Sequence, residues 1–211
     1  MKSKLYKYPR TYHLPWSPGQ SSDDKVLQDT SHFEGKLVDV MVKMDGENIT
    51  MYPDYIHARS IDSRDHESRH WVKRLHNQIR HDIPEGWRIC GENVFAEHSI
   101  PYENLPSYFL VFSIWNEQNM CLTWRETGEW VGLLGLCKVR KIATLPWDHK
   151  IEERLNSIQD TFVNEEGYVV RVRETFHYDN FSRCVAKWVR KGHVQTDTHW
   201  MHRNLVVNKL A

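Results

Sequence analysis

The chain has 211 residues, of which 40% are hydrophobic and 27% are charged, and its 28 basic and 28 acidic side chains cancel to a formal net charge of zero. This balance excludes a global basic field, so a polyanion such as a nucleic acid would have to meet a local patch. The length is sufficient for one domain with a sizeable core and without disulfide or metal staples, and we expect residues 1–211 to form a single domain.

Features of membrane and secreted proteins are lacking in this sequence. No apolar run approaches the ~20 residues that a membrane-spanning helix needs, and the N-terminal stretch MKSKLYKYPR lacks the apolar core of a secretory signal. The four cysteines lie far apart and form no CxxC pair, which indicates free thiols in a reducing compartment. We therefore expect a cytoplasmic protein without a membrane partner.

Hydrophobic periodicity and turn residues divide the chain into predicted elements. In chain order these are a loop (14–25), strands (37–43, 47–52 and 55–60), a helix (64–80), strands (87–95, 108–115 and 119–124), helices (125–136 and 149–160) and strands (167–173 and 182–190). Because strands and helices do not alternate regularly, this order predicts an α+β fold with antiparallel sheets rather than a doubly wound fold. Neither a P-loop pattern nor GxGxxG is present.

The stretch VKMDGENI, residues 42–49, places a lysine at the end of a predicted strand. Asp45-Gly46 is typical of a tight turn, so this fragment alone predicts a surface hairpin with a solvated lysine. Three further charged residues interrupt predicted strands, however, namely Glu92, Glu166 and Lys187. Charged groups are rarely buried unless they are paired or functional. Together with Lys43 they indicate a polar cleft floored by sheet, where an amine and a carboxylate-held metal would suit a phosphate-bearing substrate.

At these positions the sequence resembles the covalent nucleotidyltransferases, which include ATP-dependent polynucleotide ligases and mRNA capping enzymes. Six motifs occur in family order: KMDG (43–46), RS (59–60), GEN (91–93), FLVFSIW (109–115), EGYVVR (166–171) and VAKW (185–188). The stretches KYPRTYHLP (7–15), LPSYFLVF (105–112) and HWMHRNLVVNKL (199–210) are similar to a small standalone RNA ligase family, so the resemblance covers nearly the whole chain.

The resemblance implies that Lys43 attacks the α-phosphorus of ATP to give a lysine–AMP phosphoramidate and pyrophosphate. AMP then passes to an RNA 5′-phosphate, which a 3′-OH attacks. An ordinary lysine amine is protonated at pH 7, so its pKa has to be lowered by nearby positive charge. Lys187, Arg59 and Mg²⁺ (or Mn²⁺) are expected to supply that charge.

The resemblance also assigns roles to the remaining motif residues. Glu166 is expected to hold the metal, and Asp45 to hold it too or to orient Lys43. Glu92 is expected to accept hydrogen bonds from the ribose hydroxyls, and Phe112 to stack on adenine. Arg10 and His13 belong either to a polar arm near the triphosphate or RNA, or only to a capped N-terminal segment.

Two positions depart from the family pattern. An aspartate often follows the stacking phenylalanine, where this chain has Ser113. Many relatives have a second lysine at the position of Val189, and we expect Arg190 or Lys191 to carry part of the phosphate-binding charge instead. The 24 residues after Lys187 are too few for the OB domain that DNA ligases and capping enzymes add, which favours RNA ligation.

The expected partners are RNA ends, single-stranded or in a nicked duplex. Basic clusters at Arg69–Arg74 and Lys187–Lys191 would bind these ends. A helper protein or a homodimer is left open.

Two alternatives compete with this interpretation. His66-Glu67-Ser68-Arg69-His70 is a literal HExxH, the pattern of zinc metallopeptidases, and on a helix its histidines would share one face as two zinc ligands must. The apolar residues of the predicted helix lie on the other face, so these histidines are expected to point to solvent. The second alternative is a nucleotide- or RNA-binding module without catalysis; all motif positions that carry chemistry are filled, which argues against it.

Overall fold

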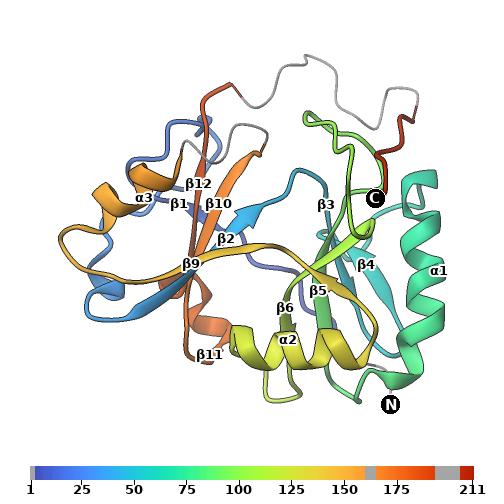
Figure 1. Ribbon diagram of the computed structural model, residues 1–211. Coiled ribbons are helices and arrows are strands. Elements are labelled where there is room, and N and C mark those ends of the chain that lie inside the picture. Colours follow the sequence, from blue (N-terminus) through green and yellow to red (C-terminus); the bar gives the residue numbers. More distant parts are fainter. Residues whose placement is uncertain (1–2, 160–164, 193–204) are drawn as a thin grey trace. The chain divides into compact units, whose positions relative to one another are not determined.

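The computed structural model describes residues 3–159, 165–192 and 205–211, and its elements are shown in Figure 1. The described chain forms two compact units, each assembled from segments that are distant in sequence. The first contains residues 3–8, 45–138 and 205–211, and the second contains residues 9–44, 139–159 and 165–192. Each unit is built around its own sheet.

The sheet of the second unit has the strand order β1-β12-β10-β2-β9, and its neighbours are antiparallel apart from β1 and β12. Its strands are β1 (Tyr12–His13), β2 (Leu37–Lys43), β9 (Lys141–Pro146), β10 (Gly167–Val172) and β12 (Val185–Val189). The same unit contains α3 (Ile151–Gln159), β11 (Phe176–His177) and the 3-10 helices η1 (Ser31–Phe33) and η4 (Tyr178–Arg183).

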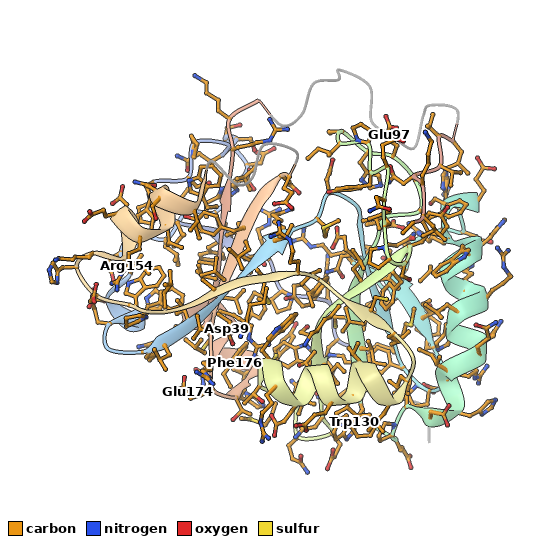
Figure 2. All side chains as sticks on the ribbon, viewed as in Figure 1. Asp39, Glu97, Trp130, Arg154, Glu174 and Phe176 are labelled. Carbon is orange, nitrogen blue, oxygen red and sulfur yellow. The ribbon has the colours of Figure 1, made fainter. Side chains whose placement is uncertain are left out.

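A charged residue inside β2 has a structural explanation. Asp39, which is labelled in Figure 2, is 1% exposed. Its carboxylate accepts a hydrogen bond of 2.6 Å from Thr144 Oγ1 and lies 3.4 Å from Lys141 Nζ. Both partners are on the neighbouring strand β9. A charge within a strand therefore does not by itself mark a functional position in this chain.

The sheet of the first unit has the order β7-β6-β5-β3-β4, with β8 parallel to β6 and the other pairs antiparallel. Its strands are β3 (Glu47–Met51), β4 (Ile56–Ala58), β5 (Arg88–Asn93), β6 (Phe109–Trp115), β7 (Met120–Cys121) and β8 (Cys137–Lys138). Its helices are α1 (His70–Ile79) and α2 (Trp124–Leu133), with the 3-10 helices η2 (Glu67–Arg69) and η3 (Arg80–Asp82) beside α1.

Alternation along the strands assigns one face of this sheet to the core. Ile49, Met51 and Val111 are buried with residues of α1 and α2 in one apolar cluster. The helix α2 begins with a capping box, in which Thr123 and Glu126 satisfy backbone amides of its first turn. Because side chains alternate, residues between the core positions, such as Thr50, lie on the opposite face.

The predicted fold class is confirmed, and most predicted elements are present with shorter bounds. The helix expected over 64–80 is α1 alone, because His66 is extended and residues 67–69 form the 3-10 helix η2. Residue 160 of the third predicted helix lies outside the described residues. Strands β1, β8, β9 and β11 were not predicted.

The predicted hairpin around Asp45-Gly46 is wrong. Strand β2 pairs with β10 on one side and β9 on the other, and β3 pairs with β4 and β5. Both strands therefore have their two hydrogen-bonding edges occupied, and the Asp-Gly segment connects two sheets instead of joining paired strands.

Two negative expectations concern the chain as a whole. All four cysteines are free thiols. In the ranges that the structure describes, no helix has both the length and the apolar character required to cross a bilayer.

Candidate active site

Lys43 is the last residue of β2, and the register of the sheet brings Glu166 to it. Lys43 lies opposite Gly167 on the antiparallel strand β10, so the residue just before β10 is adjacent to the lysine. Lys43 Nζ and Glu166 Oε2 form a direct ion pair, with side chains 23% and 9% exposed. The structure thus brings together two motif residues that are 123 positions apart.

Gly167 allows strand β12 to approach β10 closely. A Cβ atom built on Gly167 would lie 2.1 Å from the carbonyl oxygen of Trp188, which no side chain can tolerate. Strand β12 therefore packs against β10 closely enough to exclude any residue but glycine here. The same strand carries Lys187, which lies opposite Val169.

Lys187 is the second cation of the second unit's site. Its side chain is 18% exposed, and its Nζ lies 3.4 Å from Asp24 Oδ1. Burial lowers the pKa of the Lys187 ammonium, and the charge of Lys43 lowers it further, whereas Asp24 and Glu166 act in the opposite direction. The charges of Lys43, Glu166 and Asp24 thus all act on Lys187.

Arg190 and Lys191, the two residues after β12, differ in whether their side chains are available to bind a ligand. Arg190 donates from Nε to the carbonyl oxygen of Glu165 (2.8 Å) and from its backbone N–H to that of Glu166 (3.0 Å). Arg190 therefore holds the segment that presents Glu166. Lys191 is exposed.

Asp45 belongs to the first unit. Its Oδ2 accepts hydrogen bonds from the backbone N–H groups of Ser99 (2.8 Å) and Ile100 (3.1 Å), and its own N–H donates to Tyr102 Oη (2.9 Å). These contacts anchor the loop at residues 99–102. The geometry of Asp45 is thus that of a structural anchor in the first unit.

Gly46 is required by the packing of its own sheet. A Cβ atom there would lie 2.6 Å from the carbonyl oxygen of Asn93 and 2.9 Å from Val94 Cγ1. The packing within the fold thus accounts for a glycine at this position.

Glu92 and Phe112 lie on the sheet face opposite the helices. Glu92 pairs with Leu110, which lies between the core residues Phe109 and Val111, so Glu92 lies on the face opposite the core. Phe112 lies between Val111 and Ile114 but does not belong to the core cluster. Cys90 pairs with Ser113 and the next residue, Gly91, with Val111, so Phe112 is the extra residue of a β-bulge. Bulges re-aim side chains and are common next to active sites. Phe112 is partly exposed and contacts Tyr8 edge-on, with ring centroids 5.0 Å apart.

Arg59 follows β4 and is exposed. Ala58 pairs with Ile49, so continuing the antiparallel register by one residue places Arg59 beside Asn48, on the face that carries Glu92.

Arg69 belongs to a buried polar group that sequence reasoning missed. Its guanidinium donates hydrogen bonds to both carboxylate oxygens of Glu47, from Nε (2.7 Å) and from Nη2, and Arg69 is 6% exposed. Asn93 donates from Nδ2 to the carbonyl oxygen of Ser68 (3.1 Å) beside this pair. Arg69 is therefore unavailable to RNA, which reduces the basic cluster expected at 69–74.

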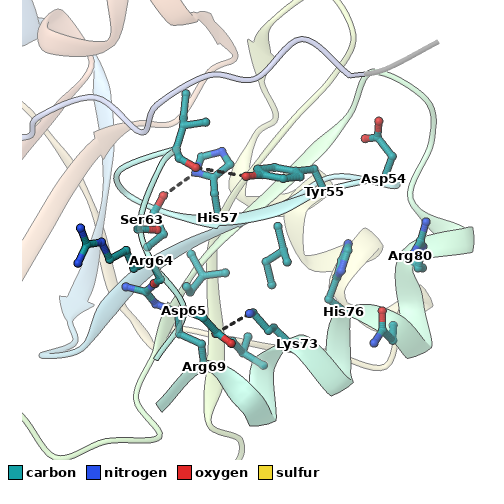
Figure 3. Close-up of a pocket in the computed structure, with 16 residues that line it drawn as sticks. Asp54, Tyr55, His57, Ser63, Arg64, Asp65, Arg69, Lys73, His76 and Arg80 are labelled. Carbon is teal, nitrogen blue, oxygen red and sulfur yellow. Dashed lines mark hydrogen bonds and ion pairs between the residues drawn. The ribbon is translucent and has the colours of Figure 1, made fainter. Parts of the chain in front are cut away.

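A cavity of about 460 Å³ lies between β4, the segment 61–65 and α1 (Figure 3). Within it, Lys73 of α1 points to Asp65 and forms an ion pair of 2.6 Å. Ile49, Ala58 and Val72 of its wall belong to the helix-covered core. Arg59, Glu92 and Phe112 do not line it. The cavity is therefore separate from the face that carries the motif residues of this unit.

The HExxH stretch does not form the helix that a zinc metallopeptidase requires. His66 has extended backbone angles (φ −148°, ψ 144°) and its Nδ1 lies 2.8 Å from Ser68 Oγ, whereas His70 begins α1. The two histidines are therefore not one turn apart on an α-helix. Within the described ranges, no group of three or more His, Cys, Asp or Glu side chains is arranged to hold a metal ion.

A magnesium-type site needs fewer protein ligands than that. Mg²⁺ is commonly bound by one or two carboxylates, with phosphates and water completing its shell. Glu166 fits as such a single carboxylate because it immediately precedes β10, whose neighbours β2 and β12 carry two lysines that could bind phosphate. Asp45 fits less well, since its Oδ2 already accepts two backbone hydrogen bonds.

A family model described as RNA ligase matches residues 36–189, and the chain therefore belongs to the RNA ligase family. A comparison with curated protein sequences finds no match.

Solved structures of RNA ligases share the fold. A Naegleria gruberi RNA ligase mutant with ATP and Mn is 16% identical, with a TM-score of 0.56 over 92% of this chain and 63% of that one. The Naegleria gruberi RNA ligase with PPi is 17% identical, with a TM-score of 0.53 over 90% and 61%. An archaeal ATP-dependent RNA ligase is 16% identical, with a TM-score of 0.58 over 88% and 48%. The present chain thus spans about half to three fifths of the length of these proteins.

Proposed function

We propose that the chain is an ATP-dependent RNA ligase that joins a 5′-phosphate end to a 3′-OH end through a lysine–AMP intermediate and an adenylylated RNA end. Family membership supports the reaction class. The observation that carries the mechanism is the position of Lys43, which is paired with Glu166 on the sheet that also holds Lys187. We further propose that residues 1–211 act as a single nucleotidyltransferase domain.

In the first step the Lys43 amine attacks the α-phosphorus of ATP. The nitrogen lone pair forms the N–P bond, and the bond from phosphorus to the pyrophosphate oxygen breaks with its electrons. The ammonium must first lose a proton, and the ion pair with Glu166 opposes this loss. Lys187 disfavours the charged form of Lys43 and provides positive charge for the phosphate oxygens, which gain negative charge in the transition state.

Glu166 is the residue proposed to hold a divalent cation, Mg²⁺ or Mn²⁺. When bound there, the cation would neutralise the carboxylate and stabilise charge on the phosphate oxygens. A Naegleria gruberi relative has been solved with ATP and Mn, which supports both cofactors. For Asp45, whose carboxylate anchors the 99–100 backbone, we propose a positioning role before a metal-binding one.

The face of the first unit's sheet opposite the helices is proposed to recognise the nucleoside. Phe112 would stack on adenine, and its position on a bulge supports a role that ordinary core packing would not need. Glu92 would accept hydrogen bonds from the ribose hydroxyls, and Arg59 would contact phosphate. Arg190 and Lys191 are proposed to add charge for the phosphates. Lys191 is the more available of the two.

RNA ends are the proposed partners, bound by local positive charge because the net charge is zero. A helper protein or a second copy of the chain remains compatible with this proposal. The alternative of a non-catalytic module predicts ATP binding without a covalent product.

The deciding experiment is incubation with α-³²P-ATP and Mg²⁺ or Mn²⁺, followed by denaturing electrophoresis. Wild-type protein should retain the label, and Lys43→Ala should not. The matched control is Lys36→Ala, which removes an exposed lysine just before the other end of β2 and should label normally. Label retained in Lys43→Ala would refute the assignment, and absence of label in the wild type would favour the binding module.

A further inference from the structure

His13 is part of the second unit's sheet and lies directly beside Lys187. Strand β1 runs parallel to β12, with His13 paired with Lys187, and Leu14 N–H donates to the Lys187 carbonyl oxygen (2.8 Å). On its other side His13 exchanges backbone hydrogen bonds with Lys25 (2.8 Å) and Leu27 (2.9 Å). The histidine is 1% exposed, so its ring has no freedom to reorient without disturbing two neighbouring segments.

The two carboxylate oxygens of Asp24 contact different residues. Oδ2 accepts from the N–H (3.1 Å) and the hydroxyl (2.9 Å) of Ser21, which fixes the carboxylate plane. Oδ1 lies 3.3 Å from His13 Nε2 and 3.4 Å from Lys187 Nζ. Burial opposes ionisation of Asp24, but the Ser21 hydrogen bonds and the Lys187 charge outweigh it and hold the pKa of this carboxyl well below its usual value.

Ser17 and Asp24 lie at the two ring nitrogens of His13. Ser17 Oγ accepts from the Val189 N–H (2.9 Å) and lies 2.8 Å from His13 Nδ1, but 3.5 Å from the Val189 carbonyl oxygen. The shorter contact favours a hydroxyl proton directed to Nδ1 and thus a ring proton on Nε2, which lies 3.3 Å from Asp24 Oδ1 without meeting hydrogen-bond geometry. Burial, with a smaller effect of the Lys187 charge, lowers the pKa of His13 to about 4, so the ring is neutral at pH 7.

These contacts form a closed chain that starts and ends on β12: Val189, Ser17, His13, Asp24 and Lys187. A histidine that only filled space would not need a carboxylate at Nε2. Asp24 is the one partner of Lys187 Nζ among the described residues. Without this carboxylate, the Lys187 ammonium would be drawn to Glu166, the other acid that acts on it.

We propose that His13 and Asp24 are positioning residues for the adenylation step, which hold the Lys187 ammonium apart from the Lys43–Glu166 pair and oriented for the α-phosphate. The inference rests on the proposed function, since it assigns the N-terminal segment to the same site. His13 contacts no reacting atom in this scheme; it acts through Asp24, and Asp24 acts through Lys187.

The kinetic test is single-turnover adenylation at saturating ATP. Asp24→Asn keeps the shape of the side chain and removes its charge; it should slow the step by about 10-fold to 100-fold, as loss of a ligand-orienting partner does elsewhere, with little change in the KM for ATP. The matched control is Asp23→Asn at the exposed neighbouring aspartate, which should be as fast as wild type. Equal rates for both variants and wild type would overturn the proposal.

A double-mutant cycle separates positioning from a general effect on the fold. If Asp24 acts through Lys187, Asp24→Asn should cost nothing further in a Lys187→Ala background. An undiminished loss there would overturn the proposal. At His13, glutamine places an N–H donor near the Nε2 position and should retain most activity, whereas asparagine should not; equal loss in both would indicate mere packing.

The tautomer of His13 can also be measured without an activity assay. Two-bond ¹H–¹⁵N couplings should show His13 as the neutral Nε2–H tautomer at pH 7, and Asp24→Asn should shift its resonances while Asp23→Asn leaves them unchanged. An Nδ1–H tautomer would overturn the proposal. A wild-type protein that forms no lysine–AMP would refute the proposed function instead, so the two failures are distinguishable.

Discussion

Lys43 and Glu166 form a direct ion pair because Lys43 lies opposite Gly167 in the register of β2 and β10. The pair stabilises a protonated lysine, which is not a nucleophile. Under the proposed function, the carboxylate partner of Lys43 would have to be engaged elsewhere before adenylation. We propose that Lys187 assists this change, because the charges of Lys43 and Lys187 disfavour each other.

Replacing Glu166 or Lys187 should cripple adenylation without unfolding the protein. Loss of one charge-stabilising group typically costs ~10²–10³ in rate, so Glu166→Gln and Lys187→Ala should each fall in this range, with unchanged far-UV circular dichroism. Glu165→Gln is the matched control, because this neighbour pairs with the exposed Arg140 at 2.7 Å. Near-normal adenylation in either variant would contradict the role given to that residue.

Phe112→Ala should raise the KM for ATP more than it lowers the rate at saturation. Stacking of a base on an aromatic ring is worth about 1–3 kcal/mol, which corresponds to roughly 5-fold to 150-fold in affinity. Phe112→Trp should restore binding. Tyr8→Phe, which keeps the ring that contacts Phe112, serves as the control. An unchanged KM in Phe112→Ala would show that the ring only packs.

Gly46→Ala should destabilise the fold. The added methyl group would meet the Asn93 carbonyl oxygen at 2.6 Å, and such overpacking costs about 1–3 kcal/mol. Gly132→Ala is the opposite case, because it lies in α2 with no atom within 4 Å of the new Cβ. There alanine should stabilise by about 1 kcal/mol through helix propensity. Urea unfolding measures both free energies, and equal stability of Gly46→Ala and wild type would show that the strand can shift.

The stability of the protein should fall as the pH is lowered from about 6.5 to about 4. The pKa of His13 is lowered to about 4 in the folded chain, from 6.5, so in this interval the unfolded chain binds a proton that the folded chain refuses. His13 contributes at most about 3 kcal/mol to this loss. Burial lowers the pKa values of His32, His57 and His76 as well, which adds in the same direction.

Urea unfolding of His13→Gln at pH 7 and pH 5 tests this window. The variant should lose less stability than wild type between the two pH values, because one of the contributing groups is gone. The lowered pKa of Asp24 affects the stability only below the ordinary pKa near 3.8, so it does not contribute to the change between pH 7 and pH 5. An identical pH dependence in the two proteins would show that His13 is not the group involved.

RNA ends should be sealed better than the same ends in DNA form. Only RNA offers a 2′-OH to the site, and the balanced net charge predicts about two to four phosphate contacts with a correspondingly shallow salt dependence. Pre-adenylated enzyme is given both substrates at equal concentration, and product is followed by gel. Equal sealing of DNA would remove the RNA assignment but leave the lysine–AMP chemistry standing.

The elements that could be predicted are those with strong periodicity. Strand β2 was predicted with its observed bounds because its sequence LVDVMVK is mostly apolar and contains three valines. Strand β9, with the sequence KIATLP, was missed because its side chains are mostly exposed or half-buried and carry no apolar alternation. The start of α1 was placed too early because His66 and Ser68 form a local hydrogen bond that competes with helix.

The residues of the candidate site were predicted from the order and spacing of the motifs around Lys43, Glu166 and Lys187. The sequence by itself could not determine which charges pair, because pairing depends on strand register between segments far apart in the chain. Only the tertiary structure separated Asp24, which holds Lys187, from its neighbour Asp23, and showed Arg69 buried against Glu47. The tertiary structure also placed β2 and β3 in different sheets. Strand β2 pairs with β10 and β9, and β3 pairs with β4 and β5, so neither strand has a free edge for the other.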